Sequence, residues 1–344
     1  MSREETGVPP GEPQGEGTSV AARPVAAPPS ASGELSRDWR APIPLNVRLT
    51  LSAHWRGRGD PTLRTDGRGA IWRTSLTPDG PGTLRLTLAR PGTDAAADGD
   101  GTLIRASAWG SGGSWLLDTL PDLLGACDDP AAFQPSQPRL RALASQLSGL
   151  RIGRTARVLE ALVPAVLEQK VVGIEAHRAW RRLVSWHGSP APGPAPAGMR
   201  VFPAPETWLS IPSWDWHRAG VEAVRARTIA TAARVAGRLE TICPLPGADA
   251  DSMLRSLPGI GPWTSAEVRQ RACGDADAVS IGDYHIPALV GWALAGRVTD
   301  DAGMLDLLAP YAGQRYRVTR LLELGGQGPP RRGPRMSVRD YRAI

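Results

Sequence analysis

A short stretch of the sequence places a glycine turn and a carboxylate at a defined spacing. Leu-Pro-Gly-Ile-Gly occupies residues 257–261 between two segments with helical character, and Asp283 follows Gly261 by 22 residues. Pro258 ends the first helix, because its ring blocks helical continuation. Gly259 and Gly261 permit backbone conformations that are closed to other residues, and without side chains they let a partner approach the backbone closely. The stretch predicts a helix–hairpin–helix.

The predicted hairpin has the features of an anion site. The second helix starts directly after Gly261, so the free N–H groups of its first turn point outward at the turn. A DNA phosphate fits such a site, and contacts of this kind do not depend on base sequence. The alternative is a tight turn that merely joins two packed helices, and the pattern alone is too short to exclude it.

Asp283 stands in Ile-Gly-Asp-Tyr-His-Ile-Pro, at the predicted start of another helix. Aspartate is a preferred N-cap residue, so capping alone would explain its presence. The residue by itself therefore favours a structural role, and its spacing from the hairpin is what indicates a second one.

Composition and charge limit the classes of partner. The chain has 344 residues, a formal net charge of +6 and a hydrophobic content of 41%. The positive net charge favours an anionic partner such as nucleic acid. No run of about 18 apolar residues occurs, and the N-terminal segment lacks an apolar core, so we expect neither a transmembrane helix nor a secretory signal. A cytoplasmic, nucleoid-associated protein without a membrane partner is expected.

The cysteines argue against common metal centres. Cys127, Cys243 and Cys273 are widely spaced, and no CxxC pair occurs. Zinc is therefore not expected, and a four-cysteine iron–sulfur cluster is excluded because the cysteines are too few. Unpaired cysteines fit a reducing compartment.

Hydrophobic periodicity predicts an α+β fold. Residues 1–38 are rich in Pro, Gly, Ser, Ala and Glu and are predicted to form a disordered tail. Four segments within residues 39–135 alternate apolar and polar positions, which predicts an N-terminal α+β domain with an antiparallel sheet, closed by a short helix at 115–127. Its strands are expected at residues 45–51, 70–76, 84–88 and 102–109. The period then changes, so 136–325 is predicted to be all-α, followed by a basic tail at 326–344.

A hairpin followed at this distance by an aspartate at a helix start resembles the helix–hairpin–helix DNA glycosylase superfamily. Leu-Pro-Gly-Ile-Gly-Pro-Trp-Thr-Ser-Ala, with Trp263 after the hairpin, looks like the 3-methyladenine DNA glycosylase II family of alkylation-repair enzymes. That family also has a sheet domain ahead of two helical subdomains, and Val166–Val171 stands where it has an Ile-Leu-Gly-Gln stretch. The resemblance covers about residues 40–325.

The resemblance implies base excision repair by a monofunctional glycosylase. Members that also cut the DNA backbone carry a lysine nucleophile at the position of Trp263, and the only lysine here is Lys170. The substrate would be an alkylated purine of the 3-methyladenine type, flipped out of damaged double-stranded DNA. Cleavage builds positive charge on the sugar, which Asp283 would stabilise while it orients or deprotonates water. Trp263 would stack on the cationic base.

The resemblance also assigns positions that contact DNA or an ion. The implied DNA contacts are Gly259, Ile260, Gly261, Thr264, Gln169 and Lys170. Lys170 would either fill the gap left by the flipped nucleotide or bind a phosphate, and Gln169 would reach the minor groove. A sodium or potassium ion would be held by the backbone carbonyls of Arg255, Leu257 and Ile260. No other cofactor is implied, and a monomer is expected.

The predicted base pocket departs from the family at one helix turn past Trp263. Glu267 stands there, where the best-known member has a tyrosine, and the last helix lacks that member's Trp-Tyr pair. The pocket is therefore less aromatic than the family implies. Two alternatives stay open: a non-catalytic helix–hairpin–helix protein in which Asp283 is only a cap, and a glycosylase for a deaminated or oxidised base.

Overall fold

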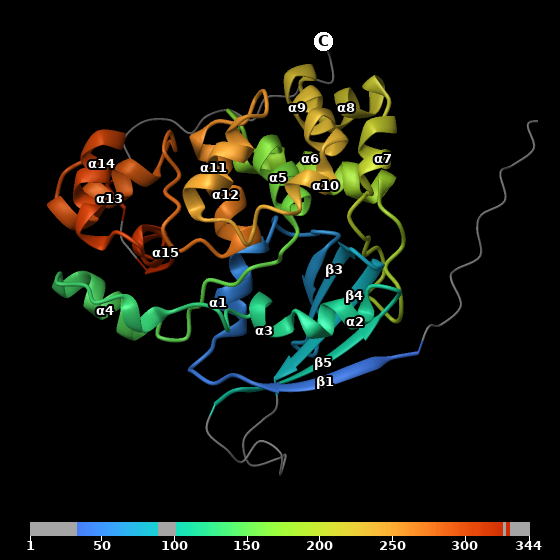
Figure 1. Ribbon diagram of the computed structural model, residues 1–344, viewed down its shortest axis with the longest axis horizontal. Helices are drawn as coiled ribbons and strands as arrows, with labels where there is room; N and C mark the ends of the chain where they lie inside the picture. The colour runs from blue at the N-terminus through green and yellow to red at the C-terminus, as the bar shows by residue number, and fades with distance from the viewer. Residues whose placement is uncertain (1–32, 89–100, 326–327, 331–344) are drawn as a thin grey trace, which may run out of the picture. The chain divides into compact units, whose positions relative to one another are not determined.

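The computed structural model describes residues 33–88, 101–325 and 328–330, which lie in one compact unit of the chain (Figure 1). A five-stranded sheet comes first, and helices follow it to residue 325. The predicted α+β class is confirmed. The tails predicted at 1–38 and 326–344 lie outside the described residues, apart from 33–38 and 328–330.

Antiparallel strands form the sheet in the order β1-β5-β4-β3-β2. Their bounds are Leu35–Arg40 (β1), Leu63–Thr65 (β2), Ile71–Thr77 (β3), Gly80–Leu88 (β4) and Leu103–Trp109 (β5). β3 and β4 form a hairpin in which Thr77 pairs with Gly80, whose φ of +111° favours glycine. The strands predicted at 70–76, 84–88 and 102–109 are confirmed.

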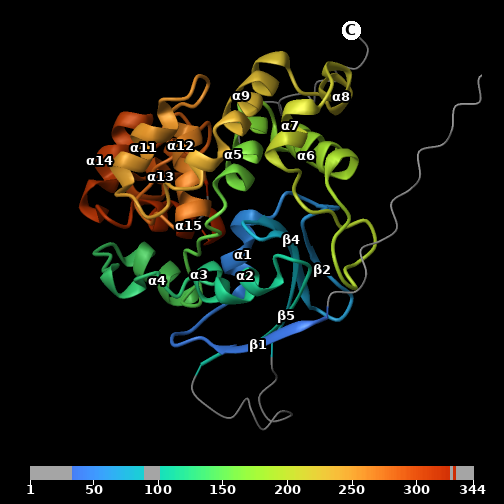
Figure 2. The same cartoon turned by 45° about the vertical axis from the view of Figure 1, so that its right-hand side comes forward.

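Short helices cover one face of the sheet. α2 (Gly113–Asp118) contacts β1, β4 and β5, and α3 (Leu120–Leu123) continues from it (Figure 2). Leu116 of α2 packs in one buried cluster with Leu84 and Ile104 of the strands. Because successive strand residues point to opposite faces, the apolar positions of the strands supply one side of this core.

A helix begins at Val47 within the segment 45–51, so the strand predicted there is wrong. α1 (Val47–Leu51) begins after Asn46, whose side-chain oxygen accepts a hydrogen bond from the Leu49 backbone N–H at 3.1 Å. The buried positions of α1 are Val47, Thr50 and Leu51. They follow helical spacing, and the cap at Asn46 outweighs the alternating pattern of the sequence.

The predicted end of the disordered tail at residue 38 is also wrong. Leu35–Arg40 form β1, which pairs with β5 from Leu35↔Ala108 to Arg40↔Leu103. The sequence Leu-Ser-Arg-Asp-Trp-Arg has little apolar alternation, so pairing with β5 rather than local pattern specifies this edge strand.

The helical region has two hydrophobic cores. Its helices are α4 (Pro138–Gln146), α5 (Val158–Leu167), α6 (Gly173–His187), α7 (Pro205–Ser210), α8 (Ser213–Ala219), α9 (Ala223–Arg234), α10 (Ala236–Leu239), α11 (Gly247–Arg255), α12 (Pro262–Val268), α13 (Ile286–Ala295), α14 (Asp301–Leu308) and α15 (Arg315–Gly325). One core gathers α5 to α12, and the other gathers α4 with α13, α14 and α15 (Figure 1). These cores are the two helical subdomains that the family resemblance implies.

α5 is the central helix of the first core and the link between the sheet and the hairpin. All of its residues are buried except Glu160, and Pro164 stands inside it without ending it. The Glu160 carboxylate accepts hydrogen bonds from Ser75 Oγ at 2.8 Å, from the Leu76 backbone N–H at 2.6 Å and from Arg73 Nη2 at 3.1 Å. This polar side chain therefore fixes α5 against β3.

Candidate active site

The predicted helix–hairpin–helix is present between α11 and α12. The turn closes with a hydrogen bond from the Ile260 N–H to the Leu257 carbonyl oxygen at 3.1 Å, and Gly259 has a φ of +87°. A Cβ atom at Gly259 would lie 2.3 Å from Oγ1 of Thr228 on α9. Both the backbone angle and the close approach therefore require glycine at this position.

Gly261 differs from Gly259. Its φ and ψ are −95° and −179°, an extended conformation that any residue adopts, so the expected conformational need for glycine here is wrong. A Cβ atom at Gly261 would meet no atom within 4 Å. The backbone at Gly261 thus faces open space, which fits the expected close approach of a partner.

The Gln169 side chain supports the hairpin through two hydrogen bonds. Its side-chain nitrogen donates to the Gly259 carbonyl oxygen at 2.9 Å and to Thr264 Oγ1 at 2.8 Å. The structure therefore brings together three of the residues that were expected to contact DNA. Because the amide N–H groups of Gln169 are engaged within the protein, a contact of Gln169 with DNA is left to its amide oxygen.

Lys170 is exposed on the turn between α5 and α6, and its backbone is left-handed, with a φ of +56°. A residue other than glycine in this region carries strain, and such residues concentrate at functional sites. The turn begins where α5 ends, at Leu167, and contains Gln169. Lys170 therefore directly follows the residue whose side chain is hydrogen-bonded to the hairpin.

The structure brings the two central predicted residues into contact. The indole Nε1–H of Trp263, in the first turn of α12, donates to Oδ2 of Asp283 at 2.9 Å. The other oxygen, Oδ1, accepts from the backbone N–H groups of His285 and Ile286 at 2.7 and 2.9 Å, so Asp283 caps α13 from two residues before its N-cap residue, His285. The cap therefore uses one oxygen of Asp283, and the second oxygen faces the residue that follows the hairpin.

Glu267 lies one turn after Trp263 and is engaged in a polar cluster. Its Oε1 accepts from Ser280 Oγ and its Oε2 from Arg271 Nη1, both at 2.7 Å. Burial disfavours the charge of Arg271, but Glu267 and other acidic groups outweigh it and raise the pKa of Arg271 above its usual range. The i,i+4 spacing of Glu267 and Arg271 was a signal for this pair in the sequence, whereas nothing local indicated Ser280.

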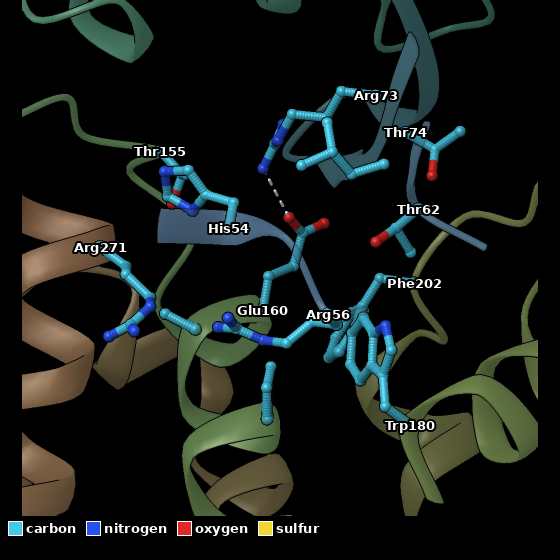
Figure 3. A pocket seen from close by; sticks show the side chains of 13 residues that line it. His54, Arg56, Thr62, Arg73, Thr74, Thr155, Glu160, Trp180, Phe202 and Arg271 are labelled. Atoms are coloured by element: carbon cyan, nitrogen blue, oxygen red, sulfur yellow. Dashed lines mark hydrogen bonds and ion pairs between the residues drawn. The ribbon is translucent and has the colours of Figure 1, made fainter. Parts of the chain in front are cut away.

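A small polar cavity lies between the sheet and α5 (Figure 3). Its labelled lining residues are His54, Arg56, Thr62, Arg73, Thr74, Thr155, Glu160, Trp180, Phe202 and Arg271. Figure 3 shows the ion pair of Arg73 with Glu160 directed across it. Its volume of about 40 Å³ admits water but not a purine, since ligand pockets occupy some hundreds of Å³. This cavity is therefore not the base pocket.

His54, which lines this cavity, is a partly buried titratable group that sequence reasoning missed. Burial lowers its pKa well below the ordinary value, and the charges of Arg73, Arg271, Arg56 and Arg320 lower it further, in that order. His54 ends η1 (Ser52–His54), and of these arginines only Arg56 is its close neighbour in the sequence, so the sequence carries no signal for the positions of Arg73, Arg271 and Arg320.

The carbonyl groups proposed for a monovalent cation belong to the hairpin and the end of α11. The Leu257 carbonyl accepts from the Ile260 N–H, and Arg255 pairs with Asp251 at 3.1 Å through its side chain. Carbonyl oxygens suit such an ion, and each has a second lone pair. Within the described ranges, no group of three or more His, Cys, Asp or Glu side chains is arranged to hold a metal ion.

Comparison with known proteins identifies relatives of this arrangement. No protein-family profile matches the sequence. The chain is 34% identical over 168 residues to a probable bifunctional transcriptional activator/DNA repair enzyme AlkA of Mycobacterium tuberculosis, in an alignment that covers 47% of this chain and 33% of that protein. The chain thus spans about a third of the length of the curated relatives it matches.

Solved structures share the fold over most of the chain. A 3-methyladenine DNA-glycosylase from Archaeoglobus fulgidus aligns with a TM-score of 0.68 at 17% identity, over 83% of this chain and 97% of that one. The apo form of the Clostridium acetobutylicum 8-oxoguanine glycosylase/lyase aligns with a TM-score of 0.63 at 10% identity, over 85% and 96%. At these identities the likeness establishes the fold alone.

A sheet domain, two helical cores, a helix–hairpin–helix and a carboxylate beside it define the fold of a helix–hairpin–helix DNA glycosylase. The chain shares this fold, and part of it is similar in sequence to the AlkA protein of Mycobacterium tuberculosis. In the part of the chain that the structure describes, no helix has the length and apolar character to cross a membrane.

Proposed function

We propose that this protein is a monofunctional DNA glycosylase that hydrolyses the N-glycosidic bond of alkylated purines in duplex DNA. The observation that carries the proposal is the hydrogen bond from Trp263 Nε1 to Asp283 Oδ2 at 2.9 Å. It places a carboxylate oxygen and a large aromatic ring side by side, immediately after the hairpin.

Asp283 acts on the sugar. Loss of the base leaves positive charge on the sugar ring, and an oriented carboxylate stabilises this charge in the transition state. Oδ1 is fixed by two backbone N–H groups, so the direction of Oδ2 is set before DNA binds. Oδ2 keeps a further lone pair beside the Trp263 bond, with which it orients or deprotonates the attacking water.

Trp263 acts on the base. The ring is partly buried at the start of α12, and its N–H is occupied by Asp283, so the ring face is the surface left for a ligand. An N3- or N7-alkylated purine carries positive charge, which is attracted to an indole face. Such a base leaves as a neutral molecule, so the site needs no general acid.

DNA is the proposed partner, bound by the protein as a monomer. The open backbone at Gly261 and the net charge of +6 support phosphate contact at the hairpin, strengthened by a sodium or potassium ion at Arg255, Leu257 and Ile260. Exposed Lys170, on its strained turn, would enter the duplex at the flipped nucleotide or bind a phosphate. Binding weakens as salt rises.

Strand cleavage is not part of the proposed activity. A glycosylase with lyase activity needs an amine that attacks the sugar, and Trp263 stands at the position of that lysine in the bifunctional relatives. The single lysine, Lys170, lies on a separate turn. The residue before it, Gln169, supports the hairpin through its hydrogen bond to the Gly259 carbonyl oxygen.

A second candidate is supported by the cluster at Glu267. Glu267, paired with Arg271 and Ser280, is a polar residue one turn after Trp263, where an aromatic residue would favour a cationic base. A neutral deaminated or oxidised base offers hydrogen-bond donors and acceptors along its edge, and such a base suits a polar side chain at this position.

A substrate panel tests the proposal. The protein is incubated under single-turnover conditions with duplexes that carry N3- or N7-methylated purine, hypoxanthine, uracil or 8-oxoguanine, and released bases are separated by chromatography. Release of methylated purines from an intact backbone, cut only after alkali, is expected. Release of hypoxanthine, uracil or 8-oxoguanine alone would establish the second candidate, and binding without release of any base would contradict both.

A further inference from the structure

Two cysteine thiols lie in contact although a long stretch of chain separates them. Cys273 Sγ donates to Cys243 Sγ at 2.8 Å, across 30 residues of sequence. Cys243 lies in the loop between α10 and α11, and Cys273 ends η4 (Arg269–Cys273), the π-helical continuation of α12. Both residues are partly buried, whereas the third cysteine, Cys127, is exposed and donates to Asp122 at 3.1 Å.

Their hydrogen bond distinguishes the two sulfurs. The pKa of Cys273 is raised, first by its hydrogen bond to Cys243 and then by burial, so Cys273 retains its proton. Because Cys273 is the donor in the contact between the two sulfurs and keeps its proton, the acceptor Cys243 is the attacking sulfur.

We propose that Cys243 and Cys273 are an oxidation site that forms a reversible disulfide with a hydroperoxide. The Cys243 thiolate attacks the peroxide O–O bond and becomes a sulfenic acid, while the leaving oxygen takes up a proton and departs as water or an alcohol. The Cys273 thiol then attacks the sulfenic sulfur, the S–S bond forms, and water leaves. Two thiols lose two electrons and two protons, and the hydroperoxide is reduced.

The geometry favours this product over other oxidation products. The sulfurs stand 2.8 Å apart and a disulfide measures about 2.05 Å, so bond formation requires a shift of less than about 1 Å. A sulfenic acid on Cys243 therefore meets the Cys273 thiol before a second peroxide molecule arrives, and further oxidation to the sulfinic acid is suppressed.

The disulfide would stabilise the helix–hairpin–helix without entering the active site. Its ring closes residues 243–273 and contains α11, the hairpin, α12 and η4. Cross-linking this segment restricts the unfolded chain. Ten residues of continuous helical turns separate Cys273 from Trp263, roughly 15 Å at 1.5 Å per residue, so the Trp263–Asp283 contact is left unchanged.

Peptide mapping of the full chain tests this inference independently of any glycosylase activity. The protein is treated with hydrogen peroxide, alkylated with N-ethylmaleimide, digested without reductant and analysed by mass spectrometry. The expected result is one cross-linked peptide pair joining Cys243 to Cys273, about 2 Da lighter than the sum of the reduced peptides, with Cys127 alkylated. Dithiothreitol should reverse it.

Thermal unfolding supplies the second readout. Oxidised wild type and oxidised Cys127→Ser should unfold at a Tm roughly 5 °C or more above the reduced proteins, and Cys243→Ser should show no rise. Three free thiols after peroxide treatment, a sulfinic acid on Cys243 beside free Cys273, or a cross-link through Cys127 would overturn the proposal. Since the wild-type map decides alone, misfolding of a variant does not affect the test.

Discussion

The Gln169 side-chain nitrogen lies 2.9 Å from the Gly259 carbonyl oxygen and donates a hydrogen bond to it. Its second hydrogen bond reaches Thr264 Oγ1, so one amide contacts both sides of the hairpin. Gln169 follows α5, which Glu160 fixes to the sheet. The hairpin that is proposed to bind DNA is thus connected through Gln169 to the buried helix α5.

Replacing Gln169 with alanine should weaken DNA binding. The Gly259 carbonyl and the Thr264 hydroxyl both lose a partner, which costs about 1–2 kcal/mol of hairpin stability, and Kd for duplex DNA should rise roughly 5- to 30-fold. Fluorescence anisotropy with labelled duplex measures Kd. Gln137→Ala, which removes a weaker hydrogen bond to Leu294, is the control and should bind normally. Equal Kd values for both variants would contradict the role given to Gln169.

The two hairpin glycines should respond differently to alanine. Gly259→Ala places a Cβ atom against Thr228 at a φ of +87°, so the free energy of unfolding should fall by about 2–3 kcal/mol. Gly261→Ala meets open space in an extended conformation and should leave stability within about 0.5 kcal/mol of wild type. Urea unfolding of both variants measures these changes.

The same pair separates folding from binding. If DNA approaches the backbone at Gly261, the added methyl group should raise Kd although the protein remains as stable as wild type. Unchanged affinity of Gly261→Ala would place the DNA contact elsewhere on the molecule.

Stability should decrease as the pH falls below neutrality. The pKa of His54 is lowered in the folded protein, mainly by burial, so the unfolded chain binds this proton first. The free energy of unfolding is therefore complete above about pH 6.5 and falls by up to about 1.4 kcal/mol per pH unit below it, until the folded pKa is reached. His177, whose pKa burial also lowers, adds to the effect.

Urea unfolding at several pH values between 7.5 and 5 checks this sign. His54→Asn should show a smaller loss of stability over that range than wild type, with the remaining slope due to His177. Identical slopes in both proteins would show that the neutral form of His54 does not contribute.

Lys170 should be functional rather than structural. Its φ of +56° is unfavourable for lysine, so Lys170→Gly relieves strain and should leave stability within about 0.5 kcal/mol of wild type. The same change should reduce base release more than tenfold under single-turnover conditions if the side chain occupies the duplex. Lys170→Asn, which also tolerates this conformation, is the matched control for backbone effects. Wild-type rates in both variants would exclude a role in base flipping.

Sequence and structure agree best where local chemistry dictates the backbone. The need for glycine at Gly259 follows from its left-handed turn, and Asp283 follows from helix capping, so both could be placed from the sequence. α1 could not, since alternating residues at 45–51 mimic a strand and the Asn46 cap decides. The Cys243–Cys273 contact could not either, because tertiary packing alone brings the loop of Cys243 to the end of η4.

The site shows the same division. Asp283 was predicted from its spacing and Trp263 from the family resemblance, and the structure adds that the indole N–H binds the carboxylate. Only one partner of Glu267 could be predicted from the sequence. Arg271 is a neighbour on the same helix, whereas Ser280 belongs to a separate loop. Interactions within one helix turn can be read from a sequence, whereas those between loops depend on the completed fold.

The central claim is that the Asp283 carboxylate performs chemistry beyond capping α13. Asp283→Asn tests it most directly, because asparagine caps a helix about as well but carries no charge. Asp300→Asn, at the cap of α14, is the matched control. Single-turnover release of N7-methylguanine and N3-methyladenine from methylated duplex should fall at least about 100-fold in Asp283→Asn and stay at the wild-type rate in Asp300→Asn, with DNA affinity retained in both. Wild-type release by Asp283→Asn would contradict the account and leave Asp283 as a helix cap.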